Sequence, residues 1–263
     1  MTSVTQPLVS IGRLGKRFGA LDAVRDLSLD VEGGEIFALL GPNGAGKTTT
    51  IRMLMGILQP TTGTATIDGL DCFAQRAEVM RRVGYLPDEP VFYDYLRGRE
   101  ILHFAGEMHG LPAKAIAARI ALLAERLTLA DDLDEYAANY SRGMKKKLAS
   151  ILALLHEPKL LILDEPTDGL DPYATRTMHT LIRERAEQGG SVFFSTHLLD
   201  QAEKLCTRVG ILFRGRLRVV RRLDELRAAQ DYDGSVEEIF FAATADGADA
   251  IDGGEPEDRG GHR

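Results

Sequence analysis

The sequence predicts an α/β fold with a mostly parallel sheet at its core, an N-terminal antiparallel β-subdomain and an inserted α-helical subdomain. The first observation is a set of short apolar runs, 35–40, 160–163 and 191–194, each typical of a buried strand. Between the last two runs, residues 173–188 have the spacing of a helix. Strands that alternate with helices favour a parallel sheet, so these runs define the predicted core.

Two further stretches predict the subdomains. Residues 8–31 combine branched and aromatic residues with polar interruptions and small turns, which indicates short antiparallel strands. Residues 47–58 have helical periodicity after the first buried run and a glycine-rich loop. From 90 to 155 the chain is rich in amphipathic helical patterns, for example 113–129, and poor in strand-like runs. We therefore expect a helical subdomain at about 90–155.

Composition indicates a folded globular protein and limits the classes of partner that we expect. Hydrophobic residues make up 44% and charged residues 27%, and the apolar runs are far shorter than the roughly 20 residues that cross a bilayer. The net charge of −7 argues against a surface dedicated to nucleic-acid phosphates. Residues 1–9 lack the pattern of a secretory signal, and Cys72 and Cys206 are too few for a disulfide framework. We expect a cytoplasmic protein with reduced thiols and no nucleic-acid partner.

The end of the sequence differs from the rest. Residues 242–263 are rich in Gly, Asp and Glu and contain few large apolar side chains. Because such a segment cannot bury enough surface to order itself, we predict a disordered tail there. The sequence has no internal repeat, so we expect a single folded domain over 1–241.

A glycine-rich loop lies between the first buried strand and the helix that follows it. Residues 41–48 read Gly-Pro-Asn-Gly-Ala-Gly-Lys-Thr, which fits the P-loop pattern of Gly, four residues and Gly-Lys-Ser/Thr. The glycines let backbone N–H groups converge on phosphate oxygens, and the positive end of the helix favours an anion. The alternative is an accidental glycine-rich turn, against which the flanking strand and helix argue. The sequence therefore predicts a P-loop NTPase core.

The loop residues divide into backbone and side-chain contributors. Lys47 is expected to reach the β- and γ-phosphates as a catalytic charge, and the Thr48 hydroxyl is expected to help hold Mg²⁺. The residues of this stretch that we predict to bind the nucleotide are Gly41, Pro42, Asn43, Gly44, Ala45, Gly46, Lys47, Thr48 and Thr49.

Two carboxylates and a histidine follow predicted strands. Asp164 suits Mg²⁺, while Glu165, one step on, could activate the water that attacks the γ-phosphate. His197 follows the apolar run at 191–194, where it could hydrogen-bond the γ-phosphate and that water. Taken alone, solvated strand caps and a structural histidine are the alternatives. The P-loop upstream favours catalytic roles for Glu165 and His197.

With these pieces in order, the chain resembles the ATP-binding subunits of ABC transporters over about 8–241. The motif that distinguishes this family from other P-loop proteins lies at 140–148, which reads Tyr-Ser-Arg-Gly-Met-Lys-Lys-Lys-Leu before an apolar helix. The resemblance implies that ATP and Mg²⁺ are bound, and that two ATP molecules are sandwiched between two subunits.

The resemblance also assigns the signature residues to the partner's site. Ser141 and the backbone at Gly143 would contact the γ-phosphate held by the second subunit, within a trans site formed by Ser141, Arg142, Gly143 and Met144. Physics supports this, because Ser141 suits an N-cap and the positive end of the following helix would face an anion. The alternative is a capped helix whose basic first turn, 145–147, is solvated.

Two more positions take roles from the resemblance. Asp171, in Gly-Leu-Asp-Pro after the acidic pair, resembles the D-loop residue that lies near the dimer interface. Phe18 resembles the aromatic residue that stacks on adenine, and a core position is the alternative for its side chain.

Two departures from the family pattern stand out. Asp88 occupies the place where the family most often has Gln; it could still ligate Mg²⁺, but it adds negative charge beside a triphosphate. Arg142 occupies the place where the signature commonly has Gly. Together with the Met-Lys-Lys continuation, these departures resemble the ABC-2 type branch, which pairs with separate exporter-type membrane subunits.

The resulting functional prediction is an ATPase subunit that dimerises on ATP and drives an integral membrane permease, with export as the expected direction. The dimer could be a homodimer or a heterodimer, and the subunit would sit at the inner face of the membrane through its permease. One alternative is a soluble, non-transport ABC ATPase. Another is a regulatory cassette in which Asp88 weakens hydrolysis.

Overall fold

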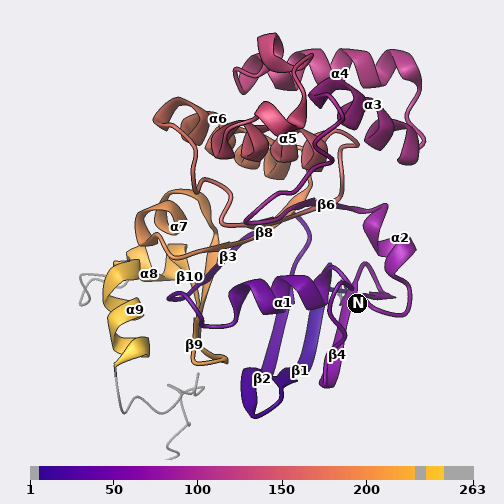
Figure 1. The fold of residues 1–263 in the computed structure, drawn as a ribbon. Coiled ribbons are helices and arrows are strands. Elements are labelled where there is room, and N and C mark those ends of the chain that lie inside the picture. Colours follow the sequence, from indigo (N-terminus) through magenta and orange to yellow (C-terminus); the bar gives the residue numbers. More distant parts are fainter. Residues whose placement is uncertain (1–5, 229–234, 246–263) are drawn as a thin grey trace, which may run out of the picture.

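The computed structural model describes residues 6–228 and 235–245, which form two β-sheets and the helices packed on them (Figure 1). The larger sheet crosses the middle of the molecule, with the smaller sheet on one side of it and a group of helices on the other. The predicted α/β architecture is confirmed, with a mostly parallel sheet, an antiparallel sheet from the N-terminal part of the chain and helices inserted between two strands of the larger sheet.

The smaller sheet is antiparallel and comes from the first part of the chain. Its strands, in the order β2-β1-β4-β5, are β1 (Val9–Phe18), β2 (Leu21–Val31), β4 (Thr62–Ile67) and β5 (Leu70–Asp71). Antiparallel pairing over 8–31 is confirmed, but β1 and β2 are long, at 10 and 11 residues, and the expectation of short strands was wrong. The polar interruptions mark register shifts inside β1, between Ile11 and Arg17, instead of strand ends.

The larger sheet has the order β10-β9-β3-β8-β7-β6. Its strands are β3 (Ile36–Leu40), β6 (Val83–Leu86), β7 (Leu160–Asp164), β8 (Ser191–Thr196), β9 (Arg208–Phe213) and β10 (Arg216–Arg222). Only β10 pairs antiparallel among these described strands. The carboxyl ends of β3, β6, β7 and β8 therefore meet at one edge, where ligands gather in open α/β sheets.

The helices within 47–58, 90–155 and 173–188 lie in regions that the sequence predicted, whereas those at 76–80, 199–205, 223–228 and 236–244 were not predicted. In chain order the helices are α1 (Lys47–Leu54), α2 (Arg76–Met80), α3 (Gly98–Met108), α4 (Ala113–Arg126), α5 (Arg142–Leu154), α6 (Pro172–Glu187), α7 (Leu199–Leu205), α8 (Leu223–Ala228) and α9 (Val236–Thr244). The predicted helix at 47–58 ends early, because Gly56 turns the chain with a φ of 61°. A Cβ there would lie 2.2 Å from the Cys72 carbonyl oxygen, so only glycine fits.

The predicted tail needs a correction at its start. Residues 242–244 belong to α9, because Val236 and Ala243 are buried on one side of this helix and anchor it to the rest of the molecule. The remainder of the predicted tail, 246–263, lies outside the described residues. The division of the chain into domains stays a prediction.

Alternation along the central strands sends side chains to two separate cores. Ile36, Ala38 and Leu40 of β3 face the core shared with α3 to α7 and α9, whereas Phe37 and Leu39 face the core shared with α1, α2 and the antiparallel sheet. Figure 1 shows α3, α4 and α5 above the large sheet and the strands β1, β2 and β4 below it. The sheet is buried on both faces, as a parallel sheet requires.

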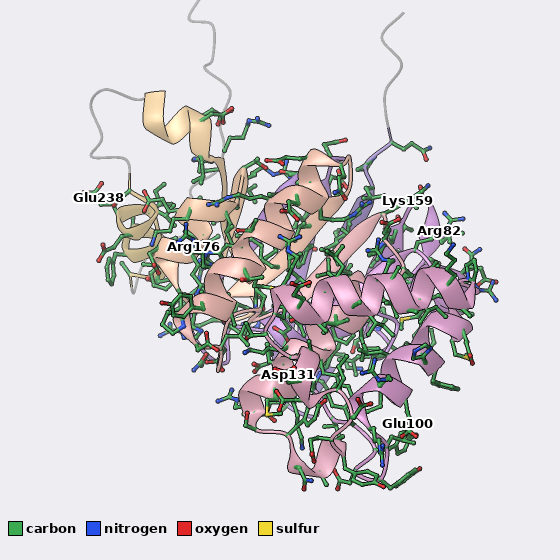
Figure 2. All side chains as sticks on the ribbon, turned by 90° about the horizontal axis from the view of Figure 1, so that it is seen from above. Arg82, Glu100, Asp131, Lys159, Arg176 and Glu238 are labelled. Atoms are coloured by element: carbon green, nitrogen blue, oxygen red, sulfur yellow. The ribbon has the colours of Figure 1, made fainter. Side chains whose placement is uncertain are left out.

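Charged residues join the antiparallel sheet to one edge of the larger one. Figure 2 labels Arg82, just before β6, and Lys159, just before β7, whose side chains lie close together at this edge. Both contact the Asp68 carboxylate, with a distance of 3.2 Å from the Lys159 Nζ to Asp68 Oδ2. Because all three side chains are partly exposed, we assign these ion pairs a small share of the stability.

Candidate functional site

The phosphate loop connects the carboxyl end of β3 to the amino end of α1, as predicted. Gly46 is the N-cap of α1 and has a φ of 109°, a conformation that non-glycine residues avoid. A Cβ at this position would lie 2.5 Å from the Ala23 carbonyl oxygen. No described side chain caps this helix, so the N–H groups at its positive end are available to an anion.

The loop opens into a cavity of about 670 Å³ that gathers most of the predicted nucleotide site. The predicted residues that line it are Phe18, Pro42, Asn43, Gly44, Ala45, Gly46, Lys47, Thr48, Thr49, Asp88, Glu165 and His197. Phe18 is 47% exposed, so the alternative of a core position is wrong. The Lys16 Nζ lies 5.2 Å from the centre of the Phe18 ring, within the range of a cation–π contact.

Lys47 is buried at the base of this cavity, with 6% of its side chain exposed. Its Nζ donates hydrogen bonds to the carbonyl oxygens of Gly41 (2.7 Å) and Pro42 (3.3 Å) and lies 3.4 Å from Glu165 Oε1. A buried ammonium needs such partners, because burial without them is costly. The side chain therefore bridges the phosphate loop and the end of β7.

Glu165 stands between Lys47 and His197. Its Oε2 lies 3.0 Å from the His197 Nδ1 and accepts a weaker hydrogen bond from the His197 backbone N–H at 3.4 Å. The Glu165 amide donates to the carbonyl and hydroxyl oxygens of Ser195, both at 3.2 Å, and its φ is 46°. A left-handed conformation costs a non-glycine residue about 1–3 kcal/mol, so the surrounding contacts hold the Glu165 backbone in place.

Asp164 lies just below the cavity surface and is almost completely buried. Burial, the largest effect, raises the pKa of this carboxyl, while the hydroxyl groups of Ser195 and Thr48 act in the opposite direction. Among the described residues, Asp164 Oδ2 and Asp88 Oδ1 are buried without a hydrogen-bond partner. Carboxylate oxygens that accept no hydrogen bond, together with the Thr48 hydroxyl, are the hard oxygen donors that Mg²⁺ prefers, so the residues present fit this ion.

The signature residues form the start of α5. The Ser141 hydroxyl accepts a hydrogen bond from the Met144 backbone N–H at 3.2 Å, which confirms its N-cap geometry. Gly143 follows in the first turn, and Arg142 forms an ion pair with Asp168, with 2.5 Å between Nη2 and Oδ2. Unlike the P-loop, Ser141, Arg142, Gly143 and Met144 do not line the cavity.

The alternative of a solvated basic turn at 145–147 was wrong for two of its three lysines. Lys146 is 1% exposed and Lys147 is 9% exposed. The Lys147 Nζ donates to the Thr128 hydroxyl at 2.9 Å and lies 3.3 Å from Asp171 Oδ2. Asp171 caps α6 by accepting from the Ala174 amide at 2.9 Å, and this bond is the main cause that lowers its pKa.

Sequence reasoning missed several residues of the cavity wall. Arg25, Arg214 and Gly215 line it, and the Arg25 amide donates to the Gly215 carbonyl at 2.7 Å. Arg214 and Gly215 form the turn between β9 and β10. The sequence Arg-Gly after a strand indicates a turn, but only the pairing of β9 with β3 brings this turn beside the phosphate loop.

Comparisons with known proteins identify the family of this chain. Residues 24–168, more than half of the chain, match the family described as ABC transporter. The uncharacterized ABC transporter ATP-binding protein YdbJ of Bacillus subtilis (strain 168) is 40% identical over 216 residues, which cover 82% of this chain and 69% of that relative. The bacitracin transport ATP-binding protein BcrA of Bacillus licheniformis is 40% identical over 205 residues, covering 78% of this chain and 66% of that relative.

A solved structure supports the same assignment. A protein described as the ATP binding subunit of an ABC transporter superimposes with a TM-score of 0.83 at 32% identity, covering 90% of this chain and 99% of that one. The fold thus defines a P-loop NTPase. The chain belongs to the ABC transporter family, as an ATP-binding subunit with ATPase activity. None of its described helices is long and apolar enough to cross a membrane.

Proposed function

We propose that this subunit dimerises on Mg²⁺-ATP and uses ATP hydrolysis to drive a separate membrane permease. The observation that carries the proposal is that the P-loop lines a large cavity while the four signature residues of the same chain do not. The start of α5 offers a capped helix end with positive polarity, which suits an anion. A second subunit, either a copy of this chain or a relative, would bring its α5 to this cavity and complete the γ-phosphate site.

The residues of the cavity would divide the work of binding and hydrolysis. Phe18 stacks on adenine, and the N–H groups of the loop hold the phosphates. Lys47 moves from its carbonyl partners to the β- and γ-phosphates, which frees Glu165 to accept a proton from the attacking water. His197, already in contact with Glu165, holds this carboxylate in place and hydrogen-bonds the γ-phosphate.

Three residues would hold the metal. Mg²⁺ supplies positive charge that offsets the charge of the phosphates. The Thr48 hydroxyl and the carboxylates of Asp164 and Asp88 are its proposed protein ligands, directly or through water. This assignment is supported by one buried oxygen on each carboxylate, Asp164 Oδ2 and Asp88 Oδ1, that accepts no hydrogen bond within the described residues.

Hydrolysis would then be coupled to movement. The γ-phosphate, held by the P-loop of one subunit and by Ser141 and Gly143 of the other, favours the closed dimer over the open one. Its loss removes these contacts, so the dimer reopens. Asp171, which contacts Lys147 behind the signature, would lie near the dimer interface and respond to that change.

Several exposed apolar side chains support the membrane partner. Large apolar or aromatic side chains are exposed on the segment after the Asp88 loop and on α3, namely Val91, Tyr93, Tyr95, Phe104 and Met108. Because these side chains come from one loop and one helix, we propose that they lie in the contact with the permease. The name of BcrA states a transport role for that relative, and the residues at 88 and 142 resemble the exporter-type ABC-2 branch. We therefore infer a permease at the inner face of the membrane and export as the direction.

The test uses Glu165→Gln, which keeps the shape of the side chain and removes its negative charge. Wild-type protein should release phosphate from ATP with Mg²⁺, and the variant should lose about 10²- to 10⁴-fold in rate, the usual contribution of a general base. With saturating Mg²⁺-ATP, the variant should accumulate as a dimer by light scattering. The matched control is Glu187→Gln, which removes an exposed carboxylate at the end of α6.

The two parts of the proposal fail separately. Unchanged turnover in Glu165→Gln, as in Glu187→Gln, would refute the role of Glu165. A Glu165→Gln variant that binds Mg²⁺-ATP and stays monomeric, with the permease absent or present, would refute the dimer.

A further inference from the structure

Lys146 is a fully buried lysine that has no role in the hydrolysis proposed above. It lies on α5, five residues after the Ser141 N-cap, and is 1% exposed. Lysine is rarely buried to this extent unless its charge is paired. Burial lowers the pKa of its ammonium, while the carboxylates of Asp88 and Asp164 act in the opposite direction. Burying an apolar residue at this position would cost less free energy than burying a lysine. The presence of the lysine therefore needs a physical explanation.

The Lys146 Nζ joins three chain segments. It donates hydrogen bonds to the carbonyl oxygens of Pro87 (3.2 Å), Asp88 (2.9 Å) and Asp164 (3.2 Å). An ammonium has three N–H donors, so these three acceptors use its full capacity. Pro87 and Asp88 follow β6, and Asp164 ends β7, the neighbouring strand. One side chain of the signature helix thus fixes the backbone at the ends of two sheet strands.

The charge of Lys146 also matches an excess of carboxylates at this edge. Asp88, Asp164 and Glu165 lie close together, and Lys47 contacts only Glu165 among them. The Lys146 Nζ lies 3.8 Å from Asp88 Oδ1, behind the surface that faces the cavity. It therefore offsets the negative charge of Asp88.

Two of these contacts fall on the backbone of the proposed metal ligands, Asp88 and Asp164. We propose that Lys146 is a positioning residue. It ties the Asp88 loop and the end of β7 to the signature helix, and so it holds Asp88 and Asp164 in the positions from which they would bind Mg²⁺. This inference rests on the proposed role of Asp88 and Asp164 with Mg²⁺-ATP. It adds a direct connection, within one subunit, between the signature that faces the partner and the metal side of its own site.

The first test measures local order without any nucleotide or metal. In Lys146→Met, hydrogen exchange of peptides covering 83–92 and 162–170 should become about tenfold faster or more, because hydrogen bonds from a charged donor are lost there. Exchange in α1 should stay unchanged. The control is Lys147→Met, which replaces a neighbouring buried lysine whose contacts are Thr128 and Asp171.

The second test separates binding from turnover. We expect kcat of Lys146→Met to fall about 10- to 100-fold, the usual effect of removing a group that orients metal ligands, with KM for ATP changed less than about threefold. Lys146→Gln, which keeps two N–H donors without the charge, should lie between Lys146→Met and the wild type in both tests.

Each outcome decides between the explanations. Exchange that is unchanged in both peptides, or that rises equally throughout the chain, would overturn the proposal, as would an unchanged kcat. If Lys146→Met and Lys146→Gln fail to fold while Lys147→Met folds, Lys146 is a core requirement and not a positioning residue. Wild-type turnover that is equal with Mg²⁺ and with EDTA would instead refute the proposed function, whatever the variants show.

Discussion

The phosphate loop offers a sharp test of the backbone geometry, through Gly46→Ala. The φ of Gly46 is 109°, and a methyl group there would lie 2.5 Å from the Ala23 carbonyl oxygen and 3.3 Å from Val24 Cγ2. The backbone strain costs about 1–3 kcal/mol. Displacing the packed neighbours costs about 1–3 kcal/mol more. We therefore expect a loss of about 2–6 kcal/mol in the free energy of unfolding, and weaker ATP binding because the first turn of α1 must shift.

Gly44→Ala in the same loop is the matched control. Gly44 has a φ of 79°, but a Cβ there meets no atom within 4 Å, so only the left-handed backbone costs about 1–2 kcal/mol. In urea unfolding without nucleotide, the midpoint concentration should decrease from wild type to Gly44→Ala and again to Gly46→Ala. The dependence of the unfolding free energy on urea concentration should be the same in all three proteins. Equal midpoints for the two variants would refute the reasoning, because it attributes their difference to the close contacts that only the methyl group at position 46 makes, with Ala23 and Val24.

The remaining predictions concern the adenine contact and a buried histidine. Phe18→Ala should weaken ATP binding by about 5- to 150-fold, the equivalent of 1–3 kcal/mol of stacking, whereas Phe241→Ala, 61% exposed on α9, should leave the nucleotide affinity unchanged in equilibrium binding. Burial, assisted by the neighbouring His109 ring at 3.6 Å, lowers the pKa of His156 from 6.5 to about 4. The stability from keeping it neutral is complete above pH 6.5 and is lost as the pH falls from 6.5 toward 4. His156→Gln should therefore reduce the fall in Tm between pH 7 and pH 5, and an identical fall in both proteins would contradict this assignment.

Features that depend on neighbours along the chain were predictable. The strand, glycine loop and helix around Lys47, and the N-cap at Ser141, rest on short-range backbone geometry and were placed correctly. The end of α1 was not, because the residue that stops it, Gly56, is required by a contact with Cys72 from another part of the chain. The length of β1 and β2 was also underestimated, since bulges inside a strand look like turns in the sequence.

The sequence by itself determined the chemistry of this protein: which backbone amides can hold phosphates, which strand ends carry acids, and which helix begins with a signature. Only the tertiary structure decided how these groups act on one another. It buried Lys146 beneath Asp88 and Asp164, set Glu165 between Lys47 and His197, and brought the turn at Arg214 to the cavity. The physical reason is that the desolvation and pairing of a charge depend on the groups that surround its side chain in space. The order of the strands in the sheet determines which groups these are, and spacing along the sequence does not.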